Sequence, residues 1–547
     1  MYPAFASMAV RSELSPANWR KPYLRWLDGI EEGWGIPLLL AVFVAIWWAY
    51  IGIAYSGGGL HPDVLEAWTY GRSLEWGYTK HPPLMGWIAR AWTEIFPIKN
   101  WSFQLLALVN SALALWAVDL ISRRFVRGDK RMIVLLLLML LPTYQFHAQR
   151  FNANTVLLAT WPFATYCFLR SFETREVKWA IAAGATAALA MLGKYYTAFL
   201  IASFLFAALC HPQRRAYFSS WAPWISTAVG LAALAPHIYW LATTGAQPIH
   251  YAIVVHAADK DFGEALHEAI FFVLGTALVM AMPAATWILI AQDRMTRFAE
   301  DFRTLNPGLW LLLLVSIGTI VFPTMVALGL GTDMAPIWSL QGLFLFSILI
   351  VCGASYQLER FLTVNLMVFV IGLSLACAFV VAPVHALYRS DHPLHEGRNF
   401  YRKSAVELTR RWHKYSKAAI PSVGGDDVLA YAAAFYSPDH PLYRERLSLA
   451  GHEAPQRATI ERGWAALCFN GDLYCATTME RFALGAPVVI RSEFVIESKM
   501  LGRRGAKQSF TAFIVPPSGE DQITPPPAAA KAADLGSAGR DLSLSYE

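Results

Sequence analysis

The sequence predicts a polytopic α-helical membrane protein that ends in a small soluble α/β domain. Hydrophobic residues make up 56% of the 547-residue chain and charged residues only 15%, a balance more apolar than that of soluble globular proteins. Apolar runs recur along residues 36–384, and a helix needs roughly 20 apolar residues to cross the hydrocarbon of a bilayer. After about residue 385 the chain becomes mixed in charge, with short apolar runs and turn signals typical of a soluble domain.

About eleven apolar segments qualify as transmembrane helices. The connection at 193–196 is the least regular, because GKYY interrupts an apolar run; one long kinked helix there would change the count. The predicted spans lie near residues 36–56, 101–122, 132–147, 153–171, 178–192, 196–210, 221–243, 266–290, 308–329, 335–354 and 361–384.

Basic residues gather in alternate connections between these spans, which predicts the orientation of the chain. Lysine and arginine are retained at the cytoplasmic face, so the N-terminal segment 1–35 is expected inside. An odd number of spans then puts the first loop, 57–100, and everything after 384 outside. The net charge of +6 is explained by this bias, and we expect no nucleic-acid partner. The basic connections contain Arg123, Arg124, Arg127, Lys130 and Arg131; Arg175 and Lys178; Arg214 and Arg215; Arg294, Arg297 and Arg303; and Arg360.

The C-terminal part divides into a domain at 385–515 and a tail at 516–547. In the domain, YRKSAVELTRRWHKY has a helical pattern, whereas VLAYAAAFY and APVVIRSEFVI are strand-like. The tail is rich in proline and alanine and cannot bury a core, so we expect it to be disordered.

Two of the six cysteines, Cys468 and Cys475, flank FNGDLY in this domain. Two strands joined at NGD would bring the thiols together, and an oxidising compartment would favour a disulfide. Two unpaired buried cysteines are the alternative. The other four cysteines lie in predicted spans.

The first external loop, which contains HPDVLEAWTYGRSLEWGYTKHPPLMGW, concentrates polar chemistry between apolar spans. Pro62 favours a helix start, and helical spacing puts Asp63 and Glu66 on one face. The diproline Pro82–Pro83 stiffens the chain and holds Lys80 and His81 extended, which brings cations near the acids. One interpretation is a site where a carboxylate activates a nucleophile and a lysine neutralises phosphate. The other is an amphipathic interfacial helix with ordinary charge pairs.

The order of acid, aromatic-rich helix, GY and HPPL resembles the first periplasmic loop of bacterial GT-C glycosyltransferases. This family includes protein O-mannosyltransferase-like enzymes and the lipid A aminoarabinose and galacturonic acid transferases. Asp63 occupies the position of the family's leading catalytic acid. Three further stretches agree with the family pattern, so the resemblance runs over most of the chain: RFNANTVLLATWPFATY, LGKYYTAFL and VGGDDVLAYAAAFYSPDHP.

The sequence also departs from that family pattern at two positions. Val64 replaces the second acid, and Lys80 replaces the acid before HPP. Glu66 lies one turn further along the same face and is a candidate substitute. A lone aspartate is a poor divalent site, so the altered acid pair does not support a divalent metal even though the family leaves one open. No metal ligands and no other cofactor are assigned.

The resemblance implies an inverting glycosyltransferase that takes a sugar from a polyprenyl-phosphate donor held in the bilayer. The acceptor would be a lipid or glycan of the cell envelope, such as lipid A, core oligosaccharide or another surface glycan. The resemblance further implies a bacterial inner membrane location, with the site and the C-terminal domain in the periplasm. Asp63 and Glu66 are the catalytic candidates. The substrate-binding candidates are Tyr78, Lys80, His81, Arg150, Asn152, Lys194, Tyr195 and His256.

Within this set, Lys80, His81, Arg150 and Lys194 are expected to stabilise the leaving phosphate. Snorkelling to lipid headgroups is the alternative for Arg150 and Lys194. Asp63 would be the base for a hydroxyl acceptor and an orienting group for a phosphate acceptor.

Other polar residues have an ordinary structural explanation beside a functional one. Asn152 and Asn154 would bond sugar hydroxyls or tie the start of the next helix, and His237 is more typical of an interfacial structural histidine. His250, His256 and Asp259 are candidate acceptor contacts. Asp333 is a candidate cap of the acceptor channel, with an ordinary helix N-cap as the alternative.

Two other functional classes compete with a transferase. A transporter or flippase would show many spans and intramembrane polar residues, but the spans show no internal repeat and the polar residues cluster at one face. A non-catalytic relative is the second alternative, because the acid pair is altered.

Overall fold

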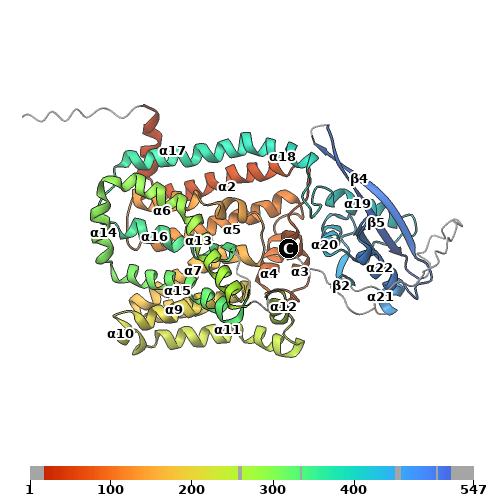
Figure 1. The fold of residues 1–547 in the computed structure, drawn as a ribbon, viewed down its shortest axis with the longest axis horizontal. Coiled ribbons are helices and arrows are strands. Elements are labelled where there is room, and N and C mark those ends of the chain that lie inside the picture. Colours follow the sequence, from red (N-terminus) through yellow and green to blue (C-terminus); the bar gives the residue numbers. More distant parts are fainter. Residues whose placement is uncertain (1–17, 257–260, 333–335, 450–456, 501–502, 519–547) are drawn as a thin grey trace, which may run out of the picture. The chain divides into compact units, whose positions relative to one another are not determined.

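The computed structural model describes residues 18–256, 261–332, 336–449, 457–500 and 503–518 (Figure 1). The chain forms two compact units, of which the first runs to Arg402 and includes Ile496–Gln508. The second comprises Lys403–Val495 and the residues from Ser509 onward. The predicted disordered tail lies outside the described residues from 519, as do Asp259, Asp333 and the side chain of His256.

All eleven predicted apolar segments of the first unit contain helix. In chain order they are α2 (Gly35–Ala54), α5 (Asn100–Ser122), α6 (Asp129–Met139), α7 (Ala153–Thr174), α8 (Val177–Gly193), α9 (Thr197–Cys210), α11 (Ala222–Thr244), α13 (Phe262–Ala291), α15 (Pro307–Leu330), α16 (Phe344–Gly353) and α17 (Arg360–Ala376). Shorter helices join them: α1 (Lys21–Asp28), α3 (Pro62–Gly71), α4 (Leu84–Thr93), α10 (Arg214–Phe218), α12 (Gln247–His256), α14 (Met295–Arg303) and α18 (Ala382–Asp391).

Six helical segments in the described part of the chain are long and apolar enough to cross a membrane: α2, α5, α11, α13, α15 and the continuous stretch from α17 to α18. The polytopic helical class is therefore confirmed. The number of eleven crossings stays a prediction, because several helices between them are shorter than a bilayer requires or less apolar.

The GKYY interruption separates two helices and does not bend one. The indole nitrogen of Trp161, on α7, donates to Thr197 at the start of α9 over 3.1 Å. At the far end of both helices, the rings of Phe172 and His211 lie 4.8 Å apart. Helix α9 therefore runs alongside α7, and the Trp179–Tyr166 ring contact (5.5 Å) puts the start of α8 near the same far end. The two helices α8 and α9 form an antiparallel pair.

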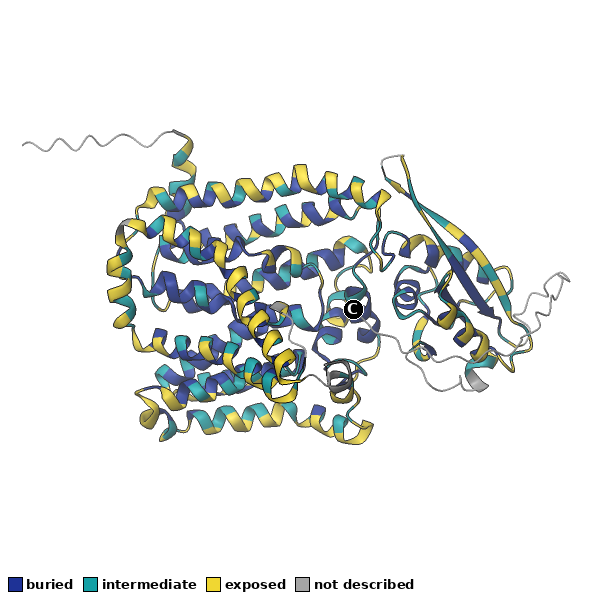
Figure 2. Cartoon of the chain, in the orientation of Figure 1, coloured by how far each residue is buried: buried dark blue, intermediate teal, exposed yellow. Residues whose placement is uncertain are grey.

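The core of the first unit is built on α5, α6 and α7, where most side chains are buried (Figure 2). Helices α11 and α13 instead keep large apolar side chains exposed, for example Leu231, Ile238, Leu274 and Leu278. Exposed apolar surface of this extent is unusual for a soluble protein and typical of helices that face lipid.

The C-terminal part of the chain contains a five-stranded sheet with the strand order β2-β1-β3-β5-β4, in which β4 and β5 run into the Ile496–Gln508 segment that is counted with the first unit. Strand β1 is parallel to β2 and β3, and β3 is antiparallel to β5. The strands are β1 (Ser422–Gly425), β2 (Leu442–Ser448), β3 (Trp464–Phe469), β4 (Ile490–Met500) and β5 (Arg503–Val515). The helices are α19 (Tyr401–Trp412), α20 (Asp427–Tyr436), α21 (Arg457–Arg462) and α22 (Leu473–Phe482). The predicted helix over YRKSAVELTRRWHKY and the predicted strand over APVVIRSEFVI are thus confirmed.

Two predicted strands of this domain are wrong. VLAYAAAFY forms α20, because Asp426 accepts a hydrogen bond from the backbone N–H of Leu429 (3.0 Å) and so caps an alanine-rich segment with high helix propensity. The chain after NGD likewise forms α22, capped by Asp472, which accepts from the N–H of Cys475 (2.9 Å).

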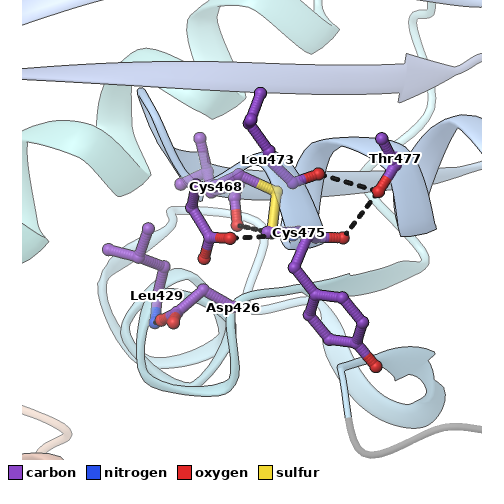
Figure 3. Close-up of a disulfide and its surroundings, with 9 residues drawn as sticks. Asp426, Leu429, Cys468, Leu473, Cys475 and Thr477 are labelled. Atoms are coloured by element: carbon purple, nitrogen blue, oxygen red, sulfur yellow. Dashed lines mark hydrogen bonds between the residues drawn. A yellow bond between two sulfur atoms is a disulfide. The ribbon is translucent and has the colours of Figure 1, made fainter. Parts of the chain in front are cut away.

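Cys468, on β3, and Cys475, on α22, are joined in a disulfide with Cα atoms 5.8 Å apart (Figure 3). Of the two alternatives, the structure therefore has the paired one. The connection is a strand followed by a helix, whereas the sequence predicts a pair of strands. Both cysteines are buried.

The boundary between the units lies later than the predicted residue 385. Helix α18 continues the last apolar helix to Asp391, and the Nδ1 atom of His385 lies 3.3 Å from the hydroxyl of Tyr50 on α2. The guanidinium of Arg398 donates to the carbonyl of Gly59 (3.2 Å). These contacts keep residues 385–402 on the first unit.

Candidate functional site

Helix α3 presents the acids of the first loop. His61 caps it by accepting from the N–H of Asp63 (3.2 Å), and Pro62 occupies the first turn, as the sequence predicts. Every residue of α3 from Val64 to Gly71 is buried. Gly71 permits the close approach of α4, since a Cβ there would lie 2.5 Å from the carbonyl oxygen of Gly86. Asp63 is therefore held at the start of a tightly packed, rigid helix.

Asn152 connects Asp63 to the start of α7. Its amide nitrogen donates to a carboxylate oxygen of Asp63 over 2.6 Å. Its amide oxygen accepts from the N–H groups of Asn154 and Thr155, both at 2.9 Å, which makes it the cap of α7. The cap fixes which end of the amide faces Asp63. Of the two predicted roles of Asn152, the structure shows the helix-tying one and adds the contact with Asp63.

The His61 ring lies beside both the backbone N–H and the carboxylate of Asp63, and its Nδ1 atom forms a hydrogen bond with only one of them at a time. Its Nδ1 atom is 3.2 Å from the backbone N–H nitrogen and 3.4 Å from a carboxylate oxygen. When Nδ1 carries no proton it accepts from the backbone, and when it is protonated it donates to the carboxylate. His61 therefore bonds either the backbone or the carboxylate of Asp63, according to which ring nitrogen carries the proton.

Asp63 is a stabilised carboxylate that remains accessible. Burial acts to raise the pKa of Asp63, but hydrogen bonds from His61 and Asn152 and the charge of Arg150 outweigh it and lower the pKa to about 2. The side chain nevertheless keeps 37% of its surface exposed. A ligand can therefore reach a carboxylate that stays ionised at every physiological pH.

Lys194, which follows α8 in the GKYY connection, lies at the same start of α7 that Asp63 contacts. Its ammonium donates to the side-chain oxygen of Asn154 (2.6 Å) and lies 5.5 Å from the centre of the Trp338 ring. Burial lowers the pKa of Lys194 to about 8, although the charge of Asp63 acts to raise it. Lys194 is thus a cation whose charge is lost at mildly alkaline pH.

Arg150 and Tyr195 complete the surroundings of Asp63 and Lys194. Arg150 is exposed, and its charge acts on Asp63. The hydroxyl of Tyr195 lies 3.0 Å from Nε2 of His237, whose Nδ1 lies 2.5 Å from the carbonyl oxygen of Trp76 in the first loop. His237 therefore tethers that loop to α11, which agrees with a structural role.

Glu66 forms a second, more enclosed cluster one turn along α3. One of its carboxylate oxygens lies 3.8 Å from the ammonium of Lys80, and the other 3.6 Å from Nε2 of His81. Its side chain is 11% exposed. The His81 ring also lies 6.2 Å from that of Tyr251, on α12. This cluster brings together one predicted catalytic residue and two predicted binding residues.

Tyr78 is buried within the loop and is not open to a ligand. Its ring stacks on Tyr70 with centroids 4.8 Å apart, and its hydroxyl donates to the carbonyl of Ser73 (3.0 Å). Of the remaining candidates, His256 ends α12, but its side chain lies outside the described residues, as do Asp259 and Asp333.

Sequence reasoning missed His61 and the lysine-binding role of Asn154. The position of His61 directly before Pro62 was a usable signal, because the residue before a helix-starting proline is its cap. The Asn154–Lys194 contact spans 40 positions, and no local pattern predicts it.

The arrangement does not fit a divalent metal. Such ions require several anionic or carbonyl oxygens directed at one point. Asp63 is instead bonded by an amide and neighboured by Arg150, while one oxygen of Glu66 faces the Lys80 ammonium and the other faces the His81 ring. In the described part of the chain, no three His, Cys, Asp or Glu side chains are placed to share a metal ion.

Comparison with known proteins agrees with the resemblance carried by the first loop and with the polytopic helical fold. Residues 80–240 match the family model described as dolichyl-phosphate-mannose-protein mannosyltransferase. The fold is similar to that of ArnT from Cupriavidus metallidurans, solved bound to undecaprenyl phosphate, with a TM-score of 0.55 and 13% identity over 88% of this chain and 98% of that one.

Two curated relatives come from Rhizobium johnstonii. The lipopolysaccharide core galacturonosyltransferase RgtB is 28% identical over 39% of this chain and 42% of its own length. The lipid A galacturonosyltransferase RgtD is 25% identical over 48% of this chain and 56% of its own length. The match thus spans about half the length of these relatives. Together with the family model, these findings confirm the resemblance to GT-C glycosyltransferases.

Proposed function

We propose that this chain is an integral membrane glycosyltransferase. It moves a sugar from a polyprenyl-phosphate donor to an acceptor of the bacterial cell envelope, at the periplasmic face of the inner membrane. The observation that carries the proposal is an exposed, ionised Asp63 beside Arg150 and Lys194. A carboxylate next to unneutralised cations suits a ligand that has both hydroxyl groups and a phosphate.

The two cations match the charge that develops during transfer. A bond forms between an acceptor oxygen and the anomeric carbon of the sugar, while the bond from that carbon to the phosphate oxygen breaks and polyprenyl phosphate leaves. If the acceptor is a hydroxyl, its proton passes to the Asp63 carboxylate. The leaving group gains negative charge, which Arg150 and Lys194 stabilise. Lys194 needs no large movement to do so, because it is already positioned by Asn154.

The low pKa of Asp63 bears on its chemical role. An efficient general base has a pKa near the working pH, whereas that of Asp63 is about 2. Asp63 is thus a weak proton acceptor and a strong hydrogen-bond acceptor, which favours orientation of the acceptor and electrostatic stabilisation of the sugar as positive charge develops. An acceptor that is already an anionic phosphate needs no deprotonation and fits this role best.

Glu66 stabilises the first loop next to the site. Because its oxygens face Lys80 and His81, it holds the second half of the loop against α3. We assign Glu66 as a positioning residue. We assign Lys80 and His81 as binding residues, whose N–H groups that do not face Glu66 donate hydrogen bonds to the phosphate of the sugar donor. Tyr78 positions the same segment through its contact with Tyr70.

The curated relatives guide the choice of substrates. Their names specify galacturonic acid as the sugar, and lipid A or lipopolysaccharide core as the acceptor. A polyprenyl-phosphate-linked galacturonic acid with lipid A is therefore the first pair to test, and an aminoarabinose donor is the second.

Reconstituted protein tests the proposal directly. Purified full-length chain in liposomes is given each synthetic donor with lipid A or core oligosaccharide, and mass spectrometry follows the acceptor while phosphate analysis follows polyprenyl phosphate. We expect a mass increase of one sugar matched by release of polyprenyl phosphate. Movement of intact donor between leaflets without cleavage would instead indicate a transporter. Absence of both, with every pair, would indicate a non-catalytic relative.

A further inference from the structure

A basic pocket lies at the other end of α5 from the first loop. The near end of α5 is fixed to that loop by Asn100, whose amide donates to the carbonyl of Gly58 (3.2 Å). With 23 residues, α5 is about 35 Å long. Beyond its far end, a pocket of about 660 Å³ opens between the residues after Ser122, the start of α6, the connection from α14 to α15 and the end of α16.

Four cations line this pocket against a single acid. The acid is Asp301, whose carboxylate accepts from the N–H of Ser355 (2.8 Å). One of the cations, Arg124, is paired with Glu173 at 3.1 Å. The pocket therefore has an excess of positive charge that its own acid does not neutralise. The four cations are Arg123, Arg124, Arg127 and Lys130.

Arg123 and Arg127 supply the uncompensated charge. Both side chains are exposed and line the pocket. Within the described part of the chain, neither guanidinium has a hydrogen-bonding or ion-pair partner. Each can offer a planar set of N–H donors, which matches the geometry of a phosphate group.

Lys130 lines the same pocket as a buried cation. It is 6% exposed, and its ammonium donates to the carbonyl of Ala354 over 2.5 Å, while the Tyr356 ring centre lies 5.8 Å away. A lysine ammonium has three donors, and the Ala354 carbonyl uses one of them. A buried, fixed cation of this kind distinguishes the pocket from a loose group of surface arginines.

Membrane orientation alone does not explain these features. Basic residues in cytoplasmic connections need only be exposed, as Arg214 and Arg215 are on α10. The pocket adds concavity, a buried lysine and an apolar portion that includes Phe125, Leu305 and Leu309. An anionic group beside apolar surface, at the ends of membrane helices, is the chemistry of a phospholipid at its interface.

We propose that this pocket binds the phosphate headgroup of an anionic membrane phospholipid, with Arg123 and Arg127 as its direct ligands. Basic pockets between transmembrane helices commonly hold such headgroups. The acyl chains would follow the apolar wall into the bilayer. This site is separate from Asp63 by the length of α5, so it does not depend on the transferase proposal.

Native mass spectrometry of the full-length chain in detergent tests the site. The probes are dioleoyl phosphatidylglycerol, dioleoyl phosphatidylcholine with the same acyl chains, and glycerol 3-phosphate as a soluble phosphate. The pocket variant is Arg123→Gln with Arg127→Gln, and the matched control is Arg214→Gln with Arg215→Gln, which removes equal charge from the same predicted face. All four substituted residues are exposed, so folding is expected to be retained and is checked by gel filtration.

We expect phosphatidylglycerol to bind the wild-type chain at least tenfold more tightly than phosphatidylcholine. The pocket variant should lose this preference, and the control variant should keep it. Equal loss in both variants would overturn the proposal, because it would show non-specific attraction to basic charge. Equal binding by the pocket variant and the wild type would overturn it too, as would saturation by glycerol 3-phosphate at concentrations where the lipid does not bind.

Discussion

Helix α3 carries two acids one turn apart, and their surroundings differ. Asp63 retains 37% of its side-chain surface and is bonded by a neutral amide. Glu66 retains 11% and faces Lys80 and His81. Since the helix and the residue chemistry are the same, the neighbours decide the role. The acid that a ligand can reach is suited to catalysis, and the acid that is already paired is suited to holding the loop.

The comparison also bears on one of the two departures from the family pattern. Lys80 stands where an acid is expected, and the structure puts its ammonium 3.8 Å from Glu66. An ion pair thus connects the two halves of the first loop within the chain. Four sets of variants separate the contributions of the two acids and of more distant parts of the molecule.

The largest effect is expected for Asp63→Asn. Loss of the charge removes the electrostatic stabilisation at the reacting sugar, and we predict that transfer falls by about 10³-fold, or about 4 kcal/mol. Glu75→Gln is the matched control, because Glu75 is an exposed acid of the same loop and should retain wild-type turnover. Turnover near the wild-type rate in Asp63→Asn would remove this residue from the site.

Lys194 should give the next largest effect and a distinctive pH dependence. Its pKa of about 8 means that the ammonium is charged below that pH and neutral above it, so transfer should decline as the pH rises past 8. Lys194→Ala should lose about 10²-fold. Lys194→Arg should recover part of the rate and lack the alkaline decline, because arginine stays charged. An unchanged alkaline decline in Lys194→Arg would assign it to another group. Asp63 stays ionised throughout this range.

Glu66→Gln should affect stability more clearly than chemistry. It leaves Lys80 and His81 without their anion, and we expect the free energy of unfolding to fall by about 2 kcal/mol, less than for a fully buried pair because Lys80 keeps 20% of its side-chain surface. Transfer should fall about tenfold through misplacement of the loop. Combining Glu66→Gln with Lys80→Gln should be less harmful than the sum of the single changes, and full additivity would argue against the pair.

The smallest effect on transfer is expected for the disulfide. Replacing Cys468 and Cys475 with serine opens a loop whose ends are seven positions apart, which should lower the stability of the second unit by about 2.5 kcal/mol. Hydrogen exchange of the amides of β3 should quicken, while transfer changes less than twofold. Cys210→Ser, at an exposed free cysteine, should change neither. A loss of transfer as large as that of Lys194→Ala would show that the second unit contributes directly to the reaction.

The sequence alone determined the features that depend on near neighbours in the chain. Apolar runs of sufficient length predict helices wherever they occur, and all eleven such segments contain helix. Pro62 and the 3.6-residue period placed Asp63 at the start of α3. The strand predicted over VLAYAAAFY failed because the capping bond of Asp426 and the propensity of alanine outweigh the apolar pattern.

The tertiary structure alone decided which distant residues meet. Asp63 and Asn152 are 89 positions apart, Lys194 and Asn154 are 40 apart, and Lys130 lies 224 positions from Ala354. Helices packed side by side bring such residues together, and the same packing leaves Asp63 open while it encloses Glu66. Local propensity carries no information about these distances, since they follow from how the helices fill space against one another.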